Sequence, residues 1–218
     1  MKYKLRLNYA FRKTLFIGLL ALISTPFLIY YAAFWWFNTN EDRTLSEAQK
    51  EWLVKEMKNM PPLPENIYRV LEKYSPGLYT ENTWDYKFKK SLLGMSPEKC
   101  QCNELYLPFI PGERNSKKEW VPLGQRDVLI KLFLERNFTQ KRCLTYRMNI
   151  GDFGRNAIGA REAADMFFGK TLETLTDREI VGLYIMLDAP TYYSPIANKE
   201  RFEERVDVFM KREKLSTK

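Results

Sequence analysis

The chain contains no histidine among its 218 residues, and this absence excludes several kinds of catalytic chemistry. A Ser-His-Asp or Cys-His nucleophilic site cannot be built without an imidazole, and neither can a catalytic metal site with histidine ligands. Acid–base catalysis would therefore have to rest on carboxylates, with lysine or tyrosine as less suitable substitutes.

Cysteine is scarce as well, because Cys100, Cys102 and Cys143 are the only three. Three thiols without histidine make a poor ligand set for zinc. In an oxidising compartment Cys143 can pair with either of the other two, and one thiol is then left over. The sequence does not choose between these pairings, and it identifies no metal ligands.

Strand patterns are nearly absent and internal repeats are absent, so we expect a mainly α fold. Capping boxes begin helices at Ser46 and Thr176, Thr139 can cap another, and Gly169 suits a helix C-terminus. Between residues 75 and 122 the only plausible helix covers 84–93. Elsewhere residues at helical spacing predict seven helices. Their marker residues are Trp52, Leu53 and Met57; Ile67, Val70, Leu71 and Tyr74; Leu129, Leu132 and Phe133; Cys143, Leu144, Arg147 and Met148; Ala160, Ala163, Ala164 and Phe167; Ile180, Leu183, Tyr184 and Leu187; Phe202, Val206, Phe209 and Met210.

A long apolar segment near the N-terminus predicts a transmembrane helix. Residues 14–37 carry no charge, and about 20 apolar residues are enough to cross a bilayer. Trp35, Trp36 and Phe37 close the segment as an interfacial aromatic belt would. We therefore expect a basic cytoplasmic tail (1–13), a membrane helix (14–37), a juxtamembrane helix or linker (38–59) and an extracytoplasmic domain (60–218).

The charge distribution supports this orientation. The tail carries five basic residues and no acid, so it accounts for +5 of the net charge of +8. Positive flanks remain on the cytoplasmic side of a membrane. Much of the positive charge is thus explained by the orientation of the chain in the membrane and does not indicate a nucleic-acid-binding surface. We therefore expect no nucleic-acid partner.

The C-terminal third carries several unusual strings in a fixed order: "FFGK" (167–170), "LTDREI" (175–180), "APTYYSP" (189–195) and "ERVDVF" (204–209). This series resembles the family 51 glycosyltransferases, the peptidoglycan polymerases of bacteria, whose counterparts read "YFGK", "LT-x-x-E", "APS-x-YSP" and "RR-x-x-VL". The resemblance implies a lysozyme-like glycosyltransferase domain, a single membrane anchor and a place in the bacterial cytoplasmic membrane.

Upstream, the same resemblance suggests site residues. The segment from the prolines at 60–64 places Glu72 on the family's catalytic Glu and Lys73 on its Asp, and "LGQRD" places Asp127 on the second Glu. The family's "K-x-x-I-L-E-x-Y-L-N" helix aligns with 140–149, where Asn149 is kept, Thr145 replaces the Glu and Arg147 replaces the Tyr. The resemblance implies a base at Glu72 and a second carboxylate at Asp127. Candidate contacts to phosphate or substrate are Arg126, Lys131, Lys141, Arg142, Asn149 and Arg205.

Each of these residues also has a plain structural interpretation. Glu72 can be one solvated carboxylate on an amphipathic helix, and Asp127 can complement the dipole at a helix N-terminus. The basic residues can form a solvated face. The Phe and His of the family's first motif are missing, and so is its "G-x-S-T-x-x-Q-Q-x-x-K-N" motif.

Three interpretations follow. The missing motifs favour a relative that keeps the frame and binds lipid-linked precursor, glycan strand or another cell-wall synthesis protein. The several cations favour a divergent polymerase that still uses Glu72. A different carboxylate enzyme, such as a glycan-cleaving one, is the third. No cofactor is indicated with certainty, and a divalent cation is an option only for an active enzyme.

Overall fold

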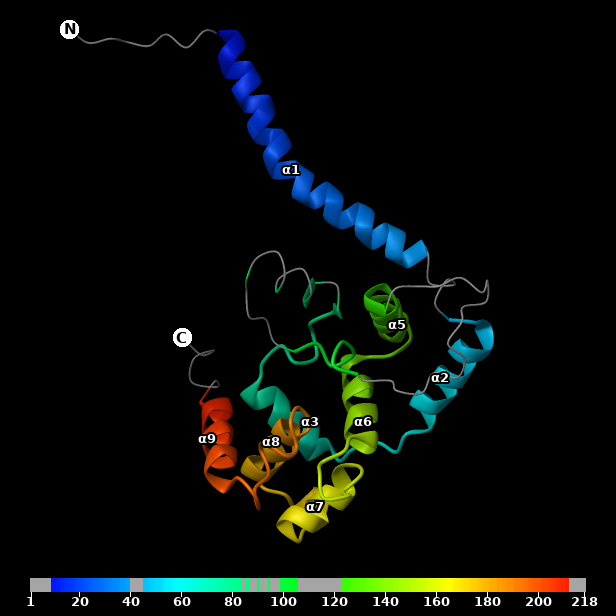
Figure 1. The fold of residues 1–218 in the computed structure, drawn as a ribbon, viewed down its shortest axis with the longest axis vertical. Helices are drawn as coiled ribbons and strands as arrows, with labels where there is room; N and C mark the ends of the chain where they lie inside the picture. The colour runs from blue at the N-terminus through cyan, green and yellow to red at the C-terminus, as the bar shows by residue number, and fades with distance from the viewer. Residues whose placement is uncertain are drawn as a thin grey trace, which may run out of the picture. The chain divides into compact units, whose positions relative to one another are not determined.

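The computed structural model describes residues 9–39, 45–83, 85–86, 90, 94, 99–105 and 123–211, and the side chains of 9–12, 22–23, 37–38 and 123–127 are outside this description. Figure 1 shows the helices in chain order. They are α1 (Tyr9–Thr39), α2 (Glu47–Asn59), α3 (Glu65–Tyr74), α5 (Leu123–Asn137), α6 (Gln140–Ile150), α7 (Ala160–Phe168), the 3-10 turn η2 (Leu172–Thr174), α8 (Asp177–Met186) and α9 (Lys199–Met210).

The mainly α fold is confirmed. In the described part of the chain there is no strand, and one isolated bridge joins Asp152 to Ile158. The helix expected over 84–93 falls mostly outside the described residues, as does most of the basic tail.

The chain divides into two compact units, residues 1–41 and 42–218. The first contains α1, whose residues 13–36 are long and apolar enough to cross a membrane by length and composition. Pro26 lies inside this helix. The division into tail, anchor, linker and domain that the sequence suggests stays a prediction.

Helix termini follow the local signals. Ser46 and Thr176 each accept a hydrogen bond from the backbone three residues on, and the partner side chains of Gln49 and Glu179 complete both capping boxes. Thr139 caps α6 through the N–H of Arg142. These bonds satisfy N–H groups that an α-helix leaves unpaired at its start.

The second unit has two hydrophobic clusters, and α6 contributes to both. The larger one gathers α3, α7, α8 and α9 around Leu144 and Met148 of α6. The smaller one joins α2, α5 and residues 99–105 to Cys143 and Tyr146 of α6. Because residues 143–148 are all buried, α6 presents solvent-accessible side chains mainly near its two ends.

Gly159 allows α7 to begin close to the end of α6. Its φ is +87°, and a Cβ at this position would lie 2.6 Å from the carbonyl oxygen of Asn149. A side chain is therefore excluded by both the backbone conformation and the close approach. At the other end of α7, Gly169 adopts the left-handed conformation expected of a C-terminal cap.

Candidate functional site

Two tyrosines and a lysine meet where α3 and the following turn approach the start of α6. Tyr68 lies on α3, and residues 75–80 turn the chain so that the Tyr79 hydroxyl donates to the Tyr68 carbonyl at 3.2 Å. The Lys141 ammonium lies 5.6 Å from the Tyr68 ring centroid and 5.2 Å from that of Tyr79. Both distances are within the range of cation–π attraction.

Glu72 is an exposed residue one turn further along α3 from Tyr68. Burial raises the pKa of the Tyr79 phenol above its ordinary value, and the negative charge of Glu72 is the next cause. Glu72 is thus close enough to Tyr79 to affect it electrostatically. The neighbouring Lys73, which occupies the position of the family's Asp, pairs with Asp177 at the start of α8 at 3.1 Å.

The remaining candidates on α5 are only partly described. Arg126 and Asp127 lie in the first turns of α5, and their side chains are outside the described residues. The expected pairing of Asp127 with Glu72 across a cleft therefore stays a prediction. Lys131 is half-buried on the same helix.

Two predicted substrate contacts on α6, Arg142 and Asn149, bind the connection between α2 and α3 in the structure. The Arg142 guanidinium donates to the carbonyls of Met57 and Met60 at 2.7 and 2.8 Å, and so helps to satisfy the C-terminus of α2. The Asn149 amide donates to the carbonyl of Pro61 at 3.0 Å. Arg205 lies half-buried on α9.

Thr145 and Arg147, which differ from the family pattern on α6, are both buried and hydrogen-bonded. Thr145 is 2% exposed, hydrogen-bonds Tyr68, and donates to the Lys141 carbonyl at 2.8 Å. Arg147 is 9% exposed and donates to Asp188 at 2.7 Å.

Asp188 also accepts from Lys99, so it joins α6, the loop after α8 and the 99–105 segment. Burial alone would raise the pKa of Asp188, but the hydrogen bond and charge of Lys99, with the charge of Arg147, hold it below the ordinary value. The triad therefore fixes the start of the "DAPTYYSP" loop against α6.

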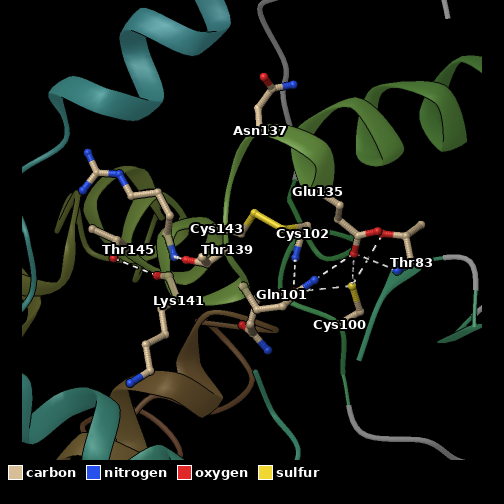
Figure 2. Close-up of a disulfide and its surroundings, with 12 residues drawn as sticks. Thr83, Cys100, Gln101, Cys102, Glu135, Asn137, Thr139, Lys141, Cys143 and Thr145 are labelled. Carbon is tan, nitrogen blue, oxygen red and sulfur yellow. Dashed lines mark hydrogen bonds between the residues drawn. A yellow bond between two sulfur atoms is a disulfide. The ribbon is translucent and has the colours of Figure 1, made fainter. Parts of the chain in front are cut away.

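A disulfide fixes the same 99–105 segment to α6. Cys102 and Cys143 are bonded, and Cys100 is the buried free thiol. Figure 2 shows Cys100 beside Glu135, whose carboxylate accepts from the thiol at 3.0 Å and from the Gln140 amide at 2.8 Å. Burial and the Glu135 charge raise the pKa of Cys100 to about 12. The thiol is therefore protonated and unreactive at neutral pH.

Within the described ranges, no group of three or more acidic or cysteine side chains is arranged to hold a metal ion. At the meeting of α3 and α6, the structure offers the exposed carboxylate of Glu72 and the ammonium of Lys141 beside two tyrosine rings.

Comparison with known proteins confirms the family resemblance of the C-terminal part of the chain. Residues 115–214, a little under half of the chain, match the transglycosylase family. This region is therefore similar to the family 51 transglycosylases. A biosynthetic peptidoglycan transglycosylase of Acinetobacter baumannii is 29% identical over 96 residues, which are 44% of this chain and 42% of that protein.

Penicillin-binding proteins are similar as well. Penicillin-binding protein 1A of Rickettsia typhi is 32% identical over 87 residues, covering 40% of this chain and 11% of that protein. Penicillin-binding protein 1F of Bacillus subtilis is 31% identical over 85 residues, covering 39% and 12%. The chain thus spans less than half the length of each of these transglycosylase relatives.

The match to the transglycosylase family includes seven of the eight candidate site residues and excludes Glu72, which lies before residue 115. The family assignment therefore rests on the α5–α9 region. The role of Glu72 rests on the alignment of the 60–73 segment.

Several residues of the site had no assigned role in the sequence. Tyr79 sits in a turn-rich stretch without periodicity, so no pattern singled it out. Thr145 and Arg147 differ from the residues that the family has at these helix positions, and this difference marked them in the sequence as positions to examine. The sequence could not supply their partners, Tyr68 and Asp188, because both lie more than 40 residues away.

Proposed function

We propose that this protein is a membrane-anchored relative of the peptidoglycan glycosyltransferases that binds the lipid-linked precursor or a glycan strand without polymerising it. The observation that carries the proposal is the replacement of a family carboxylate on α6. The position of the family's Glu is filled by Thr145, which is buried and bonded to Tyr68 and to the α6 backbone. A carboxylate that the family keeps on this helix is thus replaced by a structural hydroxyl.

The surroundings of Glu72 also support binding over catalysis. The Glu72 side chain is exposed, and among the described residues its carboxylate has no hydrogen-bond or ion-pair partner. A general base must be held within hydrogen-bond reach of the proton that it removes. In contrast, Lys141 is held by two rings and can meet an anionic group.

The alternative is an active, divergent polymerase that uses Glu72 as the base. One observation favours it: the charge of Glu72 acts on Tyr79, and the Lys141 ammonium lies over the ring of the same tyrosine. Transfer from a diphosphate-linked donor needs both kinds of group.

The topology forms part of the proposal. We infer an N-terminus in the cytoplasm, α1 across the cytoplasmic membrane of a bacterium, and residues after 41 outside it. The Cys102–Cys143 disulfide supports this location, because disulfides persist in oxidising compartments. Other cell-wall synthesis proteins are the proposed protein partners.

The test uses the full chain in detergent with lipid II, the lipid-linked precursor, in a binding assay and a polymerisation assay. We expect saturable binding that Lys141→Met weakens by about 10-fold or more, since hydrogen bonds to charged groups contribute roughly 1.5–3 kcal/mol. Lys55→Met, an exposed lysine on α2, is the matched control and should bind normally.

The two functions predict different polymerisation results. Binding without polymer supports the proposal. Polymer formation that Glu72→Gln abolishes, and that Glu51→Gln on α2 leaves intact, supports the alternative. Wild-type protein that neither binds nor polymerises lipid II refutes both.

A further inference from the structure

Lys141 is held at both its ammonium and its backbone by the same tyrosine. The ammonium lies over the Tyr68 ring at 5.6 Å. The Lys141 carbonyl accepts from the Thr145 hydroxyl, which in turn is bonded to the Tyr68 hydroxyl. The ammonium of Lys141 thus contacts the Tyr68 ring, and its carbonyl is linked to the Tyr68 hydroxyl through Thr145.

The direction of these hydrogen bonds can be assigned. Thr145 has one hydroxyl proton, and it is donated to the Lys141 carbonyl, so Tyr68 must donate to Thr145. The Tyr68 oxygen accepts from the N–H of Leu63 at 3.4 Å. The result is one chain of donors, from Leu63 through Tyr68 and Thr145 to the α6 backbone. Neighbouring bonds in such a chain polarise and strengthen one another.

Tyr79 supplies the second ring. It meets Tyr68 edge to face, with centroids 6.4 Å apart and planes inclined at 69°. Its hydroxyl bond to the Tyr68 carbonyl fixes the ring, and its face lies 5.2 Å from the Lys141 ammonium. Tyr68 is 8% exposed and Tyr79 is half-buried, so both rings are packed while the lysine stays exposed.

We propose that Tyr68, Tyr79 and Thr145 are positioning residues that hold the Lys141 ammonium in one place, ready to meet the diphosphate of the lipid-linked precursor. We name these three residues the tyrosine cradle. The proposal rests on the proposed function for the identity of the ligand, whereas the cradle itself does not depend on any ligand.

The physical reason is entropic. A free lysine side chain loses up to about 2 kcal/mol of rotamer entropy when a ligand immobilises it. Two rings restrict the side chain beforehand, so less of this cost falls on binding. Thr145 holds the backbone of Lys141 through the hydrogen bond from its hydroxyl to the Lys141 carbonyl. An ionised Glu at this position could not donate that bond.

The cradle can be tested without ligand by NMR of the full chain in detergent, with lysine labelled at the ε-carbon. Aromatic ring currents should shift the Lys141 ε-protons upfield, and Lys141→Arg assigns the signal. We expect Tyr79→Leu to remove most of this shift and Tyr79→Phe to keep it. Tyr192→Leu, which removes a ring lying under Arg201, should leave the signal unchanged. Lys141 ε-protons at ordinary lysine shifts, or a shift that Tyr79→Leu does not alter, overturn the proposal.

Binding then separates positioning from a merely structural role. We expect Tyr79→Leu to weaken binding of lipid II by about two- to fivefold, the equivalent of one exposed cation–π contact. In a Lys141→Met background the same change should have no further effect. A loss of equal size in that background would show that Tyr79 acts only through the fold and would overturn the proposal.

The two failures are distinguishable. If wild type binds neither lipid II nor inorganic pyrophosphate while the ring-current shift is present, the proposed function and the ligand assigned to the cradle are wrong and the cradle geometry stands. If lipid II binds but the shift is absent, the cradle is wrong and the function stands. Binding of pyrophosphate that Tyr79→Leu weakens equally identifies the diphosphate as the recognised group.

Discussion

Replacing Cys102 and Cys143 together by alanine should destabilise the second unit by about 4 kcal/mol. The two residues are 41 positions apart. Closing a loop of that length removes roughly 13 cal/mol/K of entropy from the unfolded chain, or about 4 kcal/mol at 25 °C. Both cysteines are fully buried, so the loss of packing adds to this cost and does not offset it.

The measurement is thermal and urea unfolding of the full chain in detergent, followed by circular dichroism. A loss of about 4 kcal/mol should lower the melting temperature by roughly 8–16 °C for a domain of this size. Cys100→Ala is the matched control. It keeps the disulfide and removes the thiol's bond to Glu135, so we expect a smaller loss, about 1–2 kcal/mol.

Two results would refute the reasoning. One is a double variant within about 1 kcal/mol of wild type, which would mean that the segment at 99–105 is held by its other contacts alone. The other is peptide mapping of the unreduced protein that finds Cys100 in the bridge.

Gly159→Ala should destabilise the protein by about 2–4 kcal/mol in the same unfolding assay, because it adds both a φ > 0 penalty and a clash with the Asn149 carbonyl. Gly169→Ala has a similar φ without a nearby atom, so a cost of only about 1 kcal/mol is expected, and equal costs would contradict the close approach. For Asp188, whose folded pKa is depressed, the stabilisation is present above the unfolded pKa of about 3.9 and lost as pH falls below it. Asp188→Asn should therefore cost much more at pH 7 than at pH 3, and a pH-independent difference would argue against its ion pair with Arg147.

Helix boundaries could be predicted from the sequence because they depend on residues a few positions apart. Ser46, Thr139 and Thr176 each cap a helix through an N–H three residues on, and all three were recognisable as caps. Spacing likewise identified the buried face of α3, from Ile67 to Tyr74. Such signals need no knowledge of the tertiary fold.

The contacts of the candidate site could not be predicted in this way. The choice of Cys102 over Cys100 depends on how residues 99–105 lie against α6, 41 positions away. Arg142 is predicted to contact phosphate, which stays a prediction, and nothing in the sequence indicated that its guanidinium also binds the end of α2. Charge and spacing show that a cation is present, whereas its partner depends on which helix packs beside it.

The family resemblance predicted the fold family, which periodicity alone could not do. It was strongest in a region whose residues shape helices and their ends rather than carry chemistry. The stretch from Gly159 to Glu179 forms α7, its left-handed cap and the capping box of α8, and it lies in the matched region. Toward Glu72 the resemblance weakens. The roles of Glu72 and Asp127 therefore remain predictions for the polymerisation assay.

The position of α6 in both hydrophobic clusters has a consequence for local dynamics. The backbone amides of residues 143–148 cannot open to solvent unless packing on two sides is lost together. Their hydrogen exchange should therefore require unfolding of the whole second unit, whereas the first turns of α2 and α9 can fray alone. Lys141 extends from the first turn of the helix for which we expect the slowest exchange, so a ligand that binds its ammonium would be attached to a helix that opens only with the whole second unit.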